Sequence, residues 1–93
     1  DITRIYIADK YIRGRGLGEE ALETMLRLAF EEMNMEGVTL DHFTDNKIAS
    51  KLYLKVGFSY EGVMRNGGKK DGKYVDLHLM SMLREEYFSR KNK

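Results

Sequence analysis

Arg13-Gly14-Arg15-Gly16-Leu17-Gly18 joins a short apolar stretch of the chain to a long amphipathic one. Before this segment, residues 2–8 are rich in β-branched and aromatic side chains, which predicts a strand that enters a loop at Asp9. After it, apolar residues recur at the spacing of a helix with one buried face, ending near Gly37: Leu17, Ala21, Leu22, Met25, Leu28, Ala29 and Met33. The glycine loop therefore lies between a strand and the start of a helix.

The rest of the chain continues the alternation of strands and helices. The alternation of side chains over residues 38–43 predicts a strand that is covered on both faces. A helix of about three turns follows, with an N-cap at Asp45 or Asn46 and with Gly57 at its end. Residues 58–64 and 74–83 predict a hairpin around Asp71-Gly72, with a polar connection longer than two residues. Residues 84–93 predict a short docked helix. The order β-α-β-α-β-β indicates one α/β or α+β domain, residues 1–93, with a mixed sheet.

Composition narrows the classes of function. The 93 residues include 16 basic and 15 acidic ones, and this balance argues against a nucleic-acid or membrane partner. Cysteine is absent, which excludes disulfides and thiolate metal sites, and no metal-ligand spacing links His42 with His78. Apolar runs are far shorter than the ~20 residues that cross a bilayer, and the chain opens without a charged leader. We therefore expect a cytoplasmic protein without a metal.

The glycine loop has the chemistry of a diphosphate site. A helix N-terminus offers unpaired N–H groups and the positive end of the helix dipole, and glycines let the backbone approach an anion. Arg13 and Arg15 can add charge-assisted hydrogen bonds. A dinucleotide fingerprint would need glycine at position 19, which is Glu19, and no Gly-Lys-Ser/Thr follows, so two common nucleotide motifs are excluded. A tight turn without a ligand is the alternative interpretation.

A second group of residues lies on the short helix and the strand after it. Asn46 and Tyr53 are seven residues apart, or two helical turns, so both can project from one face; the alternative is a helix cap and a core aromatic. His42 and His78 lie on predicted strands, where a hydrogen-bonded structural role competes with that of a base. The basic residues of the hairpin and tail are most simply solvated charge: Lys69, Lys70, Lys73, Arg90, Lys91 and Lys93.

Taken together, the two groups resemble a known family. Arg13-x-x-Gly16-x-Gly18 at a helix start, followed about thirty residues on by Asn46-x-x-Ala49-x-x-x-Tyr53-x-x-x-Gly57-Phe58, is similar to the GCN5-related N-acetyltransferases (GNAT). The likeness runs through nearly the whole chain and is greatest for the branch of ribosomal-protein and spermidine N-acetyltransferases. It implies acetyl-CoA as cofactor and an amine as acetyl acceptor.

The resemblance also implies roles for individual residues. Tyr6, Ile7 and Ala8 would end a splayed strand along the pantetheine arm, and the pyrophosphate would be wrapped by Arg13, Gly14, Arg15, Gly16, Leu17, Gly18 and Glu19. The thioester end would be lined by Asn46, Ala49 and Ser50, with Lys55 near the cofactor. Tyr53 matches the general acid of the family, which protonates or hydrogen-bonds the departing thiolate. For the base, His42 on the preceding strand is our candidate.

The resemblance covers the cofactor-binding half of a GNAT domain and lacks its N-terminal strands and helices. We therefore expect association with another copy, or a further segment that completes the domain. Three functions stay open: an N-acetyltransferase acting on a protein N-terminus, polyamine or aminoglycoside; a non-catalytic acyl-CoA-binding or assembly module; and, against the charge balance, a nucleic-acid-binding module. The choice of amine is not decided by these residues.

Overall fold

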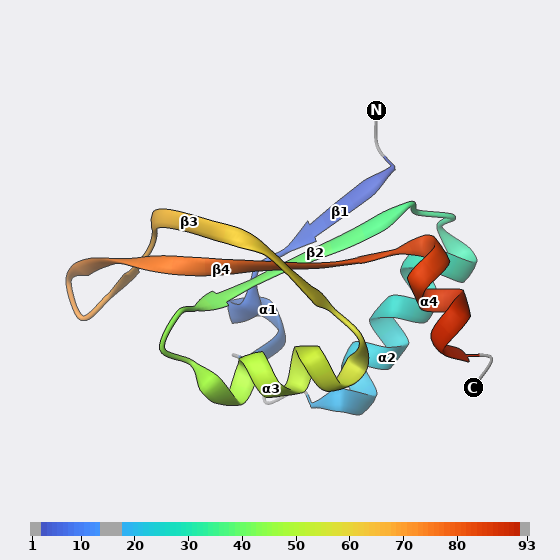
Figure 1. The fold of residues 1–93 in the computed structure, drawn as a ribbon, viewed down its shortest axis with the longest axis horizontal. Coiled ribbons are helices and arrows are strands. Elements are labelled where there is room, and N and C mark those ends of the chain that lie inside the picture. Colours follow the sequence, from blue (N-terminus) through green and yellow to red (C-terminus); the bar gives the residue numbers. More distant parts are fainter. Residues whose placement is uncertain (1–2, 14–17, 92–93) are drawn as a thin grey trace.

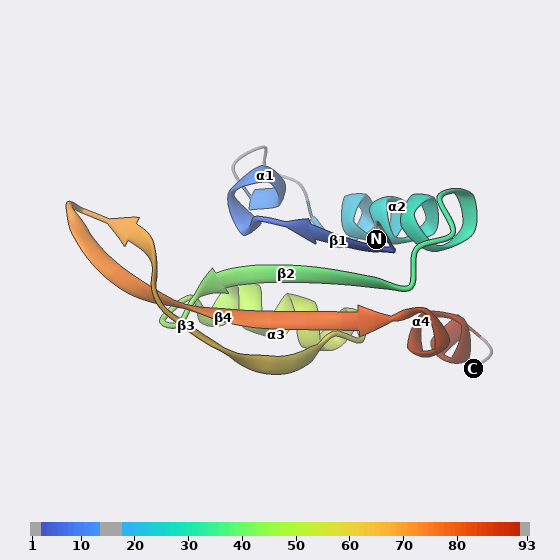
Figure 2. The same ribbon diagram turned by 90° about the horizontal axis from the view of Figure 1, so that it is seen from above.

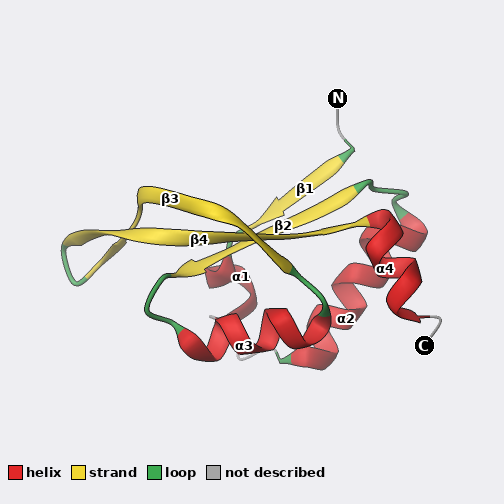
Figure 3. Cartoon of the chain, in the orientation of Figure 1, coloured by secondary structure: helices red, strands yellow, loops and turns green. Residues whose placement is uncertain are grey.

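The computed structural model describes residues 3–13 and 18–91, in which a mixed sheet carries its helices on one side (Figures 1 and 2). The elements along the chain, coloured by type in Figure 3, are β1 (Arg4–Ile7), α1 (Asp9–Arg13), α2 (Glu19–Arg27), η1 (Leu28–Glu32), β2 (Gly37–Phe43), α3 (Lys47–Val56), β3 (Ser59–Lys70), β4 (Lys73–Leu83) and α4 (Arg84–Lys91). Within these residues no helix is long and apolar enough to span a membrane.

The sheet has the order β1-β2-β4-β3 and combines both kinds of strand pairing. β1 runs parallel to β2, and a parallel neighbour needs a crossover connection, which α1, α2 and η1 supply. β2 pairs antiparallel with β4, and β4 with β3. The predicted mixed α+β sheet is confirmed. β1 stops pairing with β2 at Ile7–Leu40, whereas β2 continues to Phe43, so the two strands part at their carboxyl ends.

The core lies between the sheet and the helices. On β2 and β4, alternate residues in register face the helices, so that Val38 lies beside Met82 and Leu40 beside Met80. The helices contribute the other large buried side chains: Leu22, Leu26, Phe30, Tyr53, Val56 and Tyr87. The opposite face of β2 is less covered than predicted, because Thr39 and Phe43 there are only half-buried.

The first long helix departs from the predicted regular spacing. Its second half, η1, is a π-helix, whose wider turn shifts the buried positions along the chain. Leu28 and Met33, expected in the core, are therefore 43% and 54% exposed, while Phe30 is fully buried. The helix also ends earlier than Gly37, since Asn34 takes a left-handed φ of 58° and Gly37 already belongs to β2.

Local signals place α3 as predicted. The side chain of Asn46 accepts the Ala49 N–H at 3.1 Å and so caps the helix. Gly57 ends it with a φ of 122°, and the N–H groups of Gly57 and Phe58 both donate to the Tyr53 carbonyl, at 3.1 and 2.9 Å. Ile48 was counted on the buried face but is 72% exposed, whereas the next residue, Ala49, is fully buried.

The hairpin is longer and tighter than predicted. β3 and β4 pair as far as Lys70 and Lys73, so that Asp71 and Gly72 form a two-residue turn with φ values of 53° and 80°. Two positive φ angles are typical of a type I′ turn, which matches the twist of the flanking strands. Two register shifts along β3 let the strand bend away from a straight edge.

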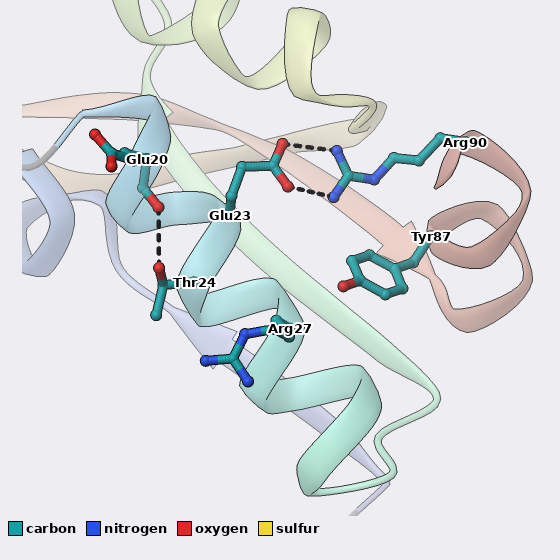
Figure 4. Close-up of a pocket in the computed structure, with 6 residues that line it drawn as sticks. All are labelled: Glu20, Glu23, Thr24, Arg27, Tyr87 and Arg90. Carbon is teal, nitrogen blue, oxygen red and sulfur yellow. Dashed lines mark hydrogen bonds and ion pairs between the residues drawn. The ribbon is translucent and has the colours of Figure 1, made fainter. Parts of the chain in front are cut away.

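Two short helices, α1 and α4, lie near the two ends of the chain. The predicted loop at Asp9 is wrong for its first residues, because Asp9–Arg13 forms a turn of helix, α1. The tail forms the docked helix α4, and Tyr87 on it is buried against Phe30 with ring centroids 4.9 Å apart. Arg90 is not solvated charge: it donates twice to Glu23 of α2 (Figure 4).

Candidate active site

A cleft of about 510 Å³ opens where β1 and β2 part. One wall comes from the end of β1 and the start of α1, and the other from the end of β2: Ala8, Asp9, Lys10, Asp41, His42 and Phe43. Asn46 and the hairpin segment 67–69 close the cleft from the side of α3. Open sheets of the α/β type bind ligands outside the carboxyl ends of their strands, and the cleft has this position.

A second hollow of about 350 Å³, between α2 and α4, has a different character (Figure 4). The ion pair between Arg90 and Glu23 lies within it, with 2.6 Å between Nη2 and Oε1. Arg90 also lies over the ring of Tyr87, at 4.9 Å from its centroid. The Arg90–Glu23 pair therefore fills this hollow with a protein contact that holds α4 in place, although Arg90 Nε has no partner among the described residues.

Asp41 organises the inner wall of the cleft. Its carboxylate is 7% exposed and accepts two hydrogen bonds, from the Tyr6 hydroxyl at 2.5 Å and from the Asp9 N–H at 2.8 Å. The second bond replaces strand pairing and turns the chain from β1 into α1. Burial, and then the adjacent carboxylate, raises the pKa of Tyr6 well above its ordinary value, since both disfavour the phenolate. Tyr6 therefore stays a hydrogen-bond donor.

Tyr53 contacts the wall of the cleft from the core. Its side chain is 0% exposed, and its hydroxyl donates to the carboxylate of Asp9, on the wall of the cleft. The ring is held by aromatic neighbours, with centroids 5.9 Å from both His42 and Phe58. A tyrosine fixed in this way offers one O–H at one place, which is the requirement for a positioned acid.

His42 is buried next to Tyr53 and lines the same cleft. The side chain is 1% exposed, and within the described part of the chain neither ring nitrogen has a hydrogen-bond partner. Burial lowers the pKa of His42 below its ordinary value, and nearby His78 lowers it further, so the ring is neutral at pH 7. A neutral imidazole keeps one nitrogen able to accept a proton or a hydrogen bond.

The predicted pyrophosphate loop is only partly within the described residues. Gly14, Arg15, Gly16 and Leu17 lie outside them, as does the side chain of Arg13, whose backbone ends α1. Gly18 is the N-cap of α2, and no side chain caps that helix. Lys55 of α3 forms a 2.9 Å ion pair with Glu19, the first residue of α2, and this contact raises the pKa of Lys55. Glu19 and Lys55 thus bring the N-terminus of α2 to the last turn of α3, whereas Asn46 at the start of α3 lines the cleft.

The remaining predicted residues divide between the cleft and the core. Ala8 and Asn46 line the cleft, and Ile7 packs against the core while the Tyr6 side chain remains 50% exposed. Ala49 is fully buried, and the Ser50 hydroxyl is hydrogen-bonded to the Tyr60 hydroxyl. For Asn46 and Tyr53, the alternative interpretation as a cap and a core aromatic is therefore correct in structural terms. Asn46 also lines the cleft, and Tyr53 contacts its wall through Asp9.

Asp9 and Asp41 were not identified from the sequence as site residues. One signal was present: Asp41 is a carboxylate inside a strand that reads as buried, where a charge needs a partner. The partners themselves lie far away, since Tyr6 is 35 residues from Asp41 and Tyr53 is 44 residues from Asp9.

Comparison with known proteins identifies the family. The model of the acetyltransferase (GNAT) family matches residues 1–58. The chain belongs to this family. Its resemblance to the GCN5-related N-acetyltransferases is thus confirmed at the level of the family and of the partial fold.

Individual relatives agree. The chain is 28% identical over 76 residues to the L-amino acid N-acetyltransferase AaaT of Escherichia coli, which is 82% of this chain and 47% of that protein. It is 30% identical over 69 residues to a probable spermine N(1)-acetyltransferase of Bacillus subtilis subsp. natto, or 74% of this chain and 45% of that one. The spermidine/spermine N-acetyltransferase SpeG of Vibrio cholerae superposes with a TM-score of 0.77 at 26% identity, over 85% of this chain and 46% of SpeG. The chain thus spans less than half the length of these relatives.

Proposed function

We propose that this chain forms the cofactor-binding and catalytic part of an N-acetyltransferase that moves an acetyl group from acetyl-CoA to a primary amine. The observation that carries the proposal is the placement of Tyr53, whose buried hydroxyl donates to Asp9 in the wall of the cleft between β1 and β2. A core tyrosine needs only a hydrogen-bond partner, but here that partner, Asp9, itself lines the cleft.

The residues present suit coenzyme A. The first N–H groups of α2 have no side-chain cap, and such groups bind phosphate oxygens well. Lys55 supplies a positive charge beside them, held there by Glu19. Glu19 and Glu20 in the first turn interact favourably with the positive end of the helix dipole, but their side chains must turn away from a bound anion. When bound, acetyl-CoA would supply a thioester for attack by the amine, with a thiolate as leaving group.

Tyr53 is suited to stabilise the leaving group. Its Oη–H can change its acceptor from the Asp9 carboxylate to a sulfur placed in the cleft when the Asp9 side chain turns away. A phenol near pKa 10 gives its proton to a thiolate near 8.5 at a cost of about 2 kcal/mol in water. Tyr53 therefore contributes mainly as a hydrogen-bond donor to the developing charge.

Two groups in the cleft can receive the proton of the amine. His42 is neutral and has an unused ring nitrogen, as a base requires. Asp41 is a carboxylate at the same wall, but its oxygens are already engaged by Tyr6 and Asp9. We therefore keep His42 as the proposed base, with Asp41 holding the wall in place.

Substitution of Tyr53 tests the proposal. In Tyr53→Phe the rate constant kcat should fall by about 10²-fold, the usual contribution of a positioned acid, while the Kd for acetyl-CoA measured by calorimetry changes little. Tyr74→Phe on the exposed hairpin is the matched control and should act like the parent. Equal turnover of Tyr53→Phe and parent would refute the role. Tight acetyl-CoA binding without acetylation of any amine would instead support a non-catalytic acyl-CoA-binding module.

A further inference from the structure

The cleft beside Tyr53 is lined by charged groups of both signs. The carboxylates of Asp9 and Asp41 lie close enough to His42 to act on its pKa. Lys10 of α1 and Lys69 of the hairpin, here called the rim lysines, also line the cleft and are exposed. A ligand that fills the cleft can therefore contact both negative and positive charge.

The two rim lysines are available to a ligand. Among the described residues neither Lys10 nor Lys69 forms an ion pair, in contrast to Lys70, which binds Asp45 at 3.3 Å. Each ammonium lies over a neighbouring ring, Lys10 at 5.5 Å from the Tyr11 centroid and Lys69 at 5.1 Å from that of Tyr74. The rings limit the positions of the lysines but leave their charge uncompensated.

The side of the cleft at His42 holds a polar group without a partner. His42 lines the cleft, and its two buried ring nitrogens have no hydrogen-bond partner among the described residues. Because burying an unpaired polar group is costly, such a group indicates a partner that arrives with the ligand when the ring turns toward the cleft. A primary amine is a suitable partner: it is attracted by the carboxylates of Asp9 and Asp41, and it can donate to the imidazole in that rotated position.

Resting on the proposed function, we infer that the acetyl acceptor is a small zwitterionic amine, an amino acid in the broad chemical sense, with its amine at Asp9, Asp41 and His42 and its anionic group at Lys10 and Lys69. A volume of about 510 Å³ suits a small molecule. A polyamine also places an amine beside Asp9 and Asp41, but its second positive charge then meets the two rim lysines, and like charges that meet at a binding surface are unfavourable.

Acetylation of matched amines tests the inference in the purified protein. Thiol release from acetyl-CoA is followed with L-alanine and L-alaninamide, with γ-aminobutyrate and its amide, and with spermidine. Each amide lacks the negative charge but has the less basic amine, so its larger unprotonated fraction would by itself favour the amide. We expect the acid of at least one pair to have the larger kcat/KM by about fivefold or more, and spermidine to be slower.

Substitutions locate the effect. Lys69→Met should lower kcat/KM for the acid and leave that for the amide unchanged, so that the preference disappears. Lys73→Met, one residue beyond the turn and outside the cleft, is the control and should keep the preference. Equal rates for acids and amides, faster turnover of spermidine, or a preference that survives in Lys69→Met would overturn the inference and leave the acetyltransferase intact. Failure to acetylate any of the amines would overturn the proposed function as well.

Discussion

Replacing Arg90 with methionine should destabilise the protein by about 2 kcal/mol, because this side chain fastens α4 to two other helices. Its guanidinium donates to Glu23 of α2 at 2.8 and 2.6 Å and to the Val56 carbonyl at the end of α3 at 2.8 Å (Figure 4). It also lies over the ring of Tyr87. Methionine keeps most of the apolar stem, so the loss reports the polar contacts.

The magnitude follows from exposure. A buried hydrogen bond to a charged group contributes about 1.5–3 kcal/mol, but the side chain of Glu23 is 41% exposed and regains water when Arg90 is removed. The bidentate pair is therefore discounted to about 1 kcal/mol, and the lost bond to the Val56 carbonyl costs about as much again. For a domain of this size, 2 kcal/mol lowers Tm by roughly 8–16 °C.

Urea unfolding of four variants checks this value. Arg27→Met is the matched control, because Arg27 lies on α2, the helix of Glu23, and pairs with Glu32 at 3.5 Å, with side chains 49% and 62% exposed. This substitution should cost less than about 0.5 kcal/mol. Glu23→Gln alone and together with Arg90→Met completes a double-mutant cycle with an expected coupling of about 1 kcal/mol. The reasoning is refuted if Arg90→Met costs no more than Arg27→Met, or if the cycle shows no coupling.

Two further changes have outcomes set by single features of the fold. Gly57→Ala should lower the free energy of unfolding in urea by about 1–3 kcal/mol, because φ at Gly57 is 122° and the new Cβ would lie 3.3 Å from side-chain atoms of Arg90 and Met82. Gly62→Ala is the control and should be nearly neutral, since its new Cβ would have no atom within 4 Å. Equal losses in the two variants would contradict this account. Since burial lowers the pKa of His42, the unfolded chain binds this proton more readily, so stability should fall as pH falls below about 6.5, by at most about 1.4 kcal/mol per pH unit. His42→Phe should weaken that dependence between pH 7.5 and 5.5, and an unchanged slope would show that other groups cause it.

The elements that could be predicted are those whose signals are local. The start and end of α3 depend on Asn46 and Gly57, which act on backbone groups three or four residues away. The two-residue turn at Asp71-Gly72 is equally local, and only the polar residues before it, which still belong to β3, concealed its length. A strand, a helix and a second strand in succession favour a parallel pair, as β1 and β2 form, but the order β1-β2-β4-β3 was not predicted, and β2 and β3 do not pair although α3 joins them.

The features that could not be predicted depend on distant partners. Arg90 is 67 residues from Glu23, so its charge reads as solvated until the fold brings α4 against α2. The π-helix at residues 28–32 also has no marker in the spacing of apolar residues, and it moved Leu28 and Met33 out of the core. Asp9 was read as a loop residue because the acceptor of its N–H, Asp41, lies on another strand.

The position of the candidate site follows from the way in which β1 and β2 separate. Asp41 and His42 are neighbours on β2 and therefore project to opposite faces of the sheet, where they would not normally meet one ligand. Because β1 stops pairing at Ile7, the sheet is open beside them, and the Asp41 carboxylate binds the Asp9 backbone instead of a strand. This brings Asp9 to the hydroxyl of Tyr53, which comes from the helix side. A proton donor, a neutral imidazole and two carboxylates thus share one cleft only because the parallel pair ends three residues before β2 does, at Leu40 and not at Phe43. We therefore expect substitutions that extend the pairing of β1 and β2 to lower turnover even where they stabilise the fold.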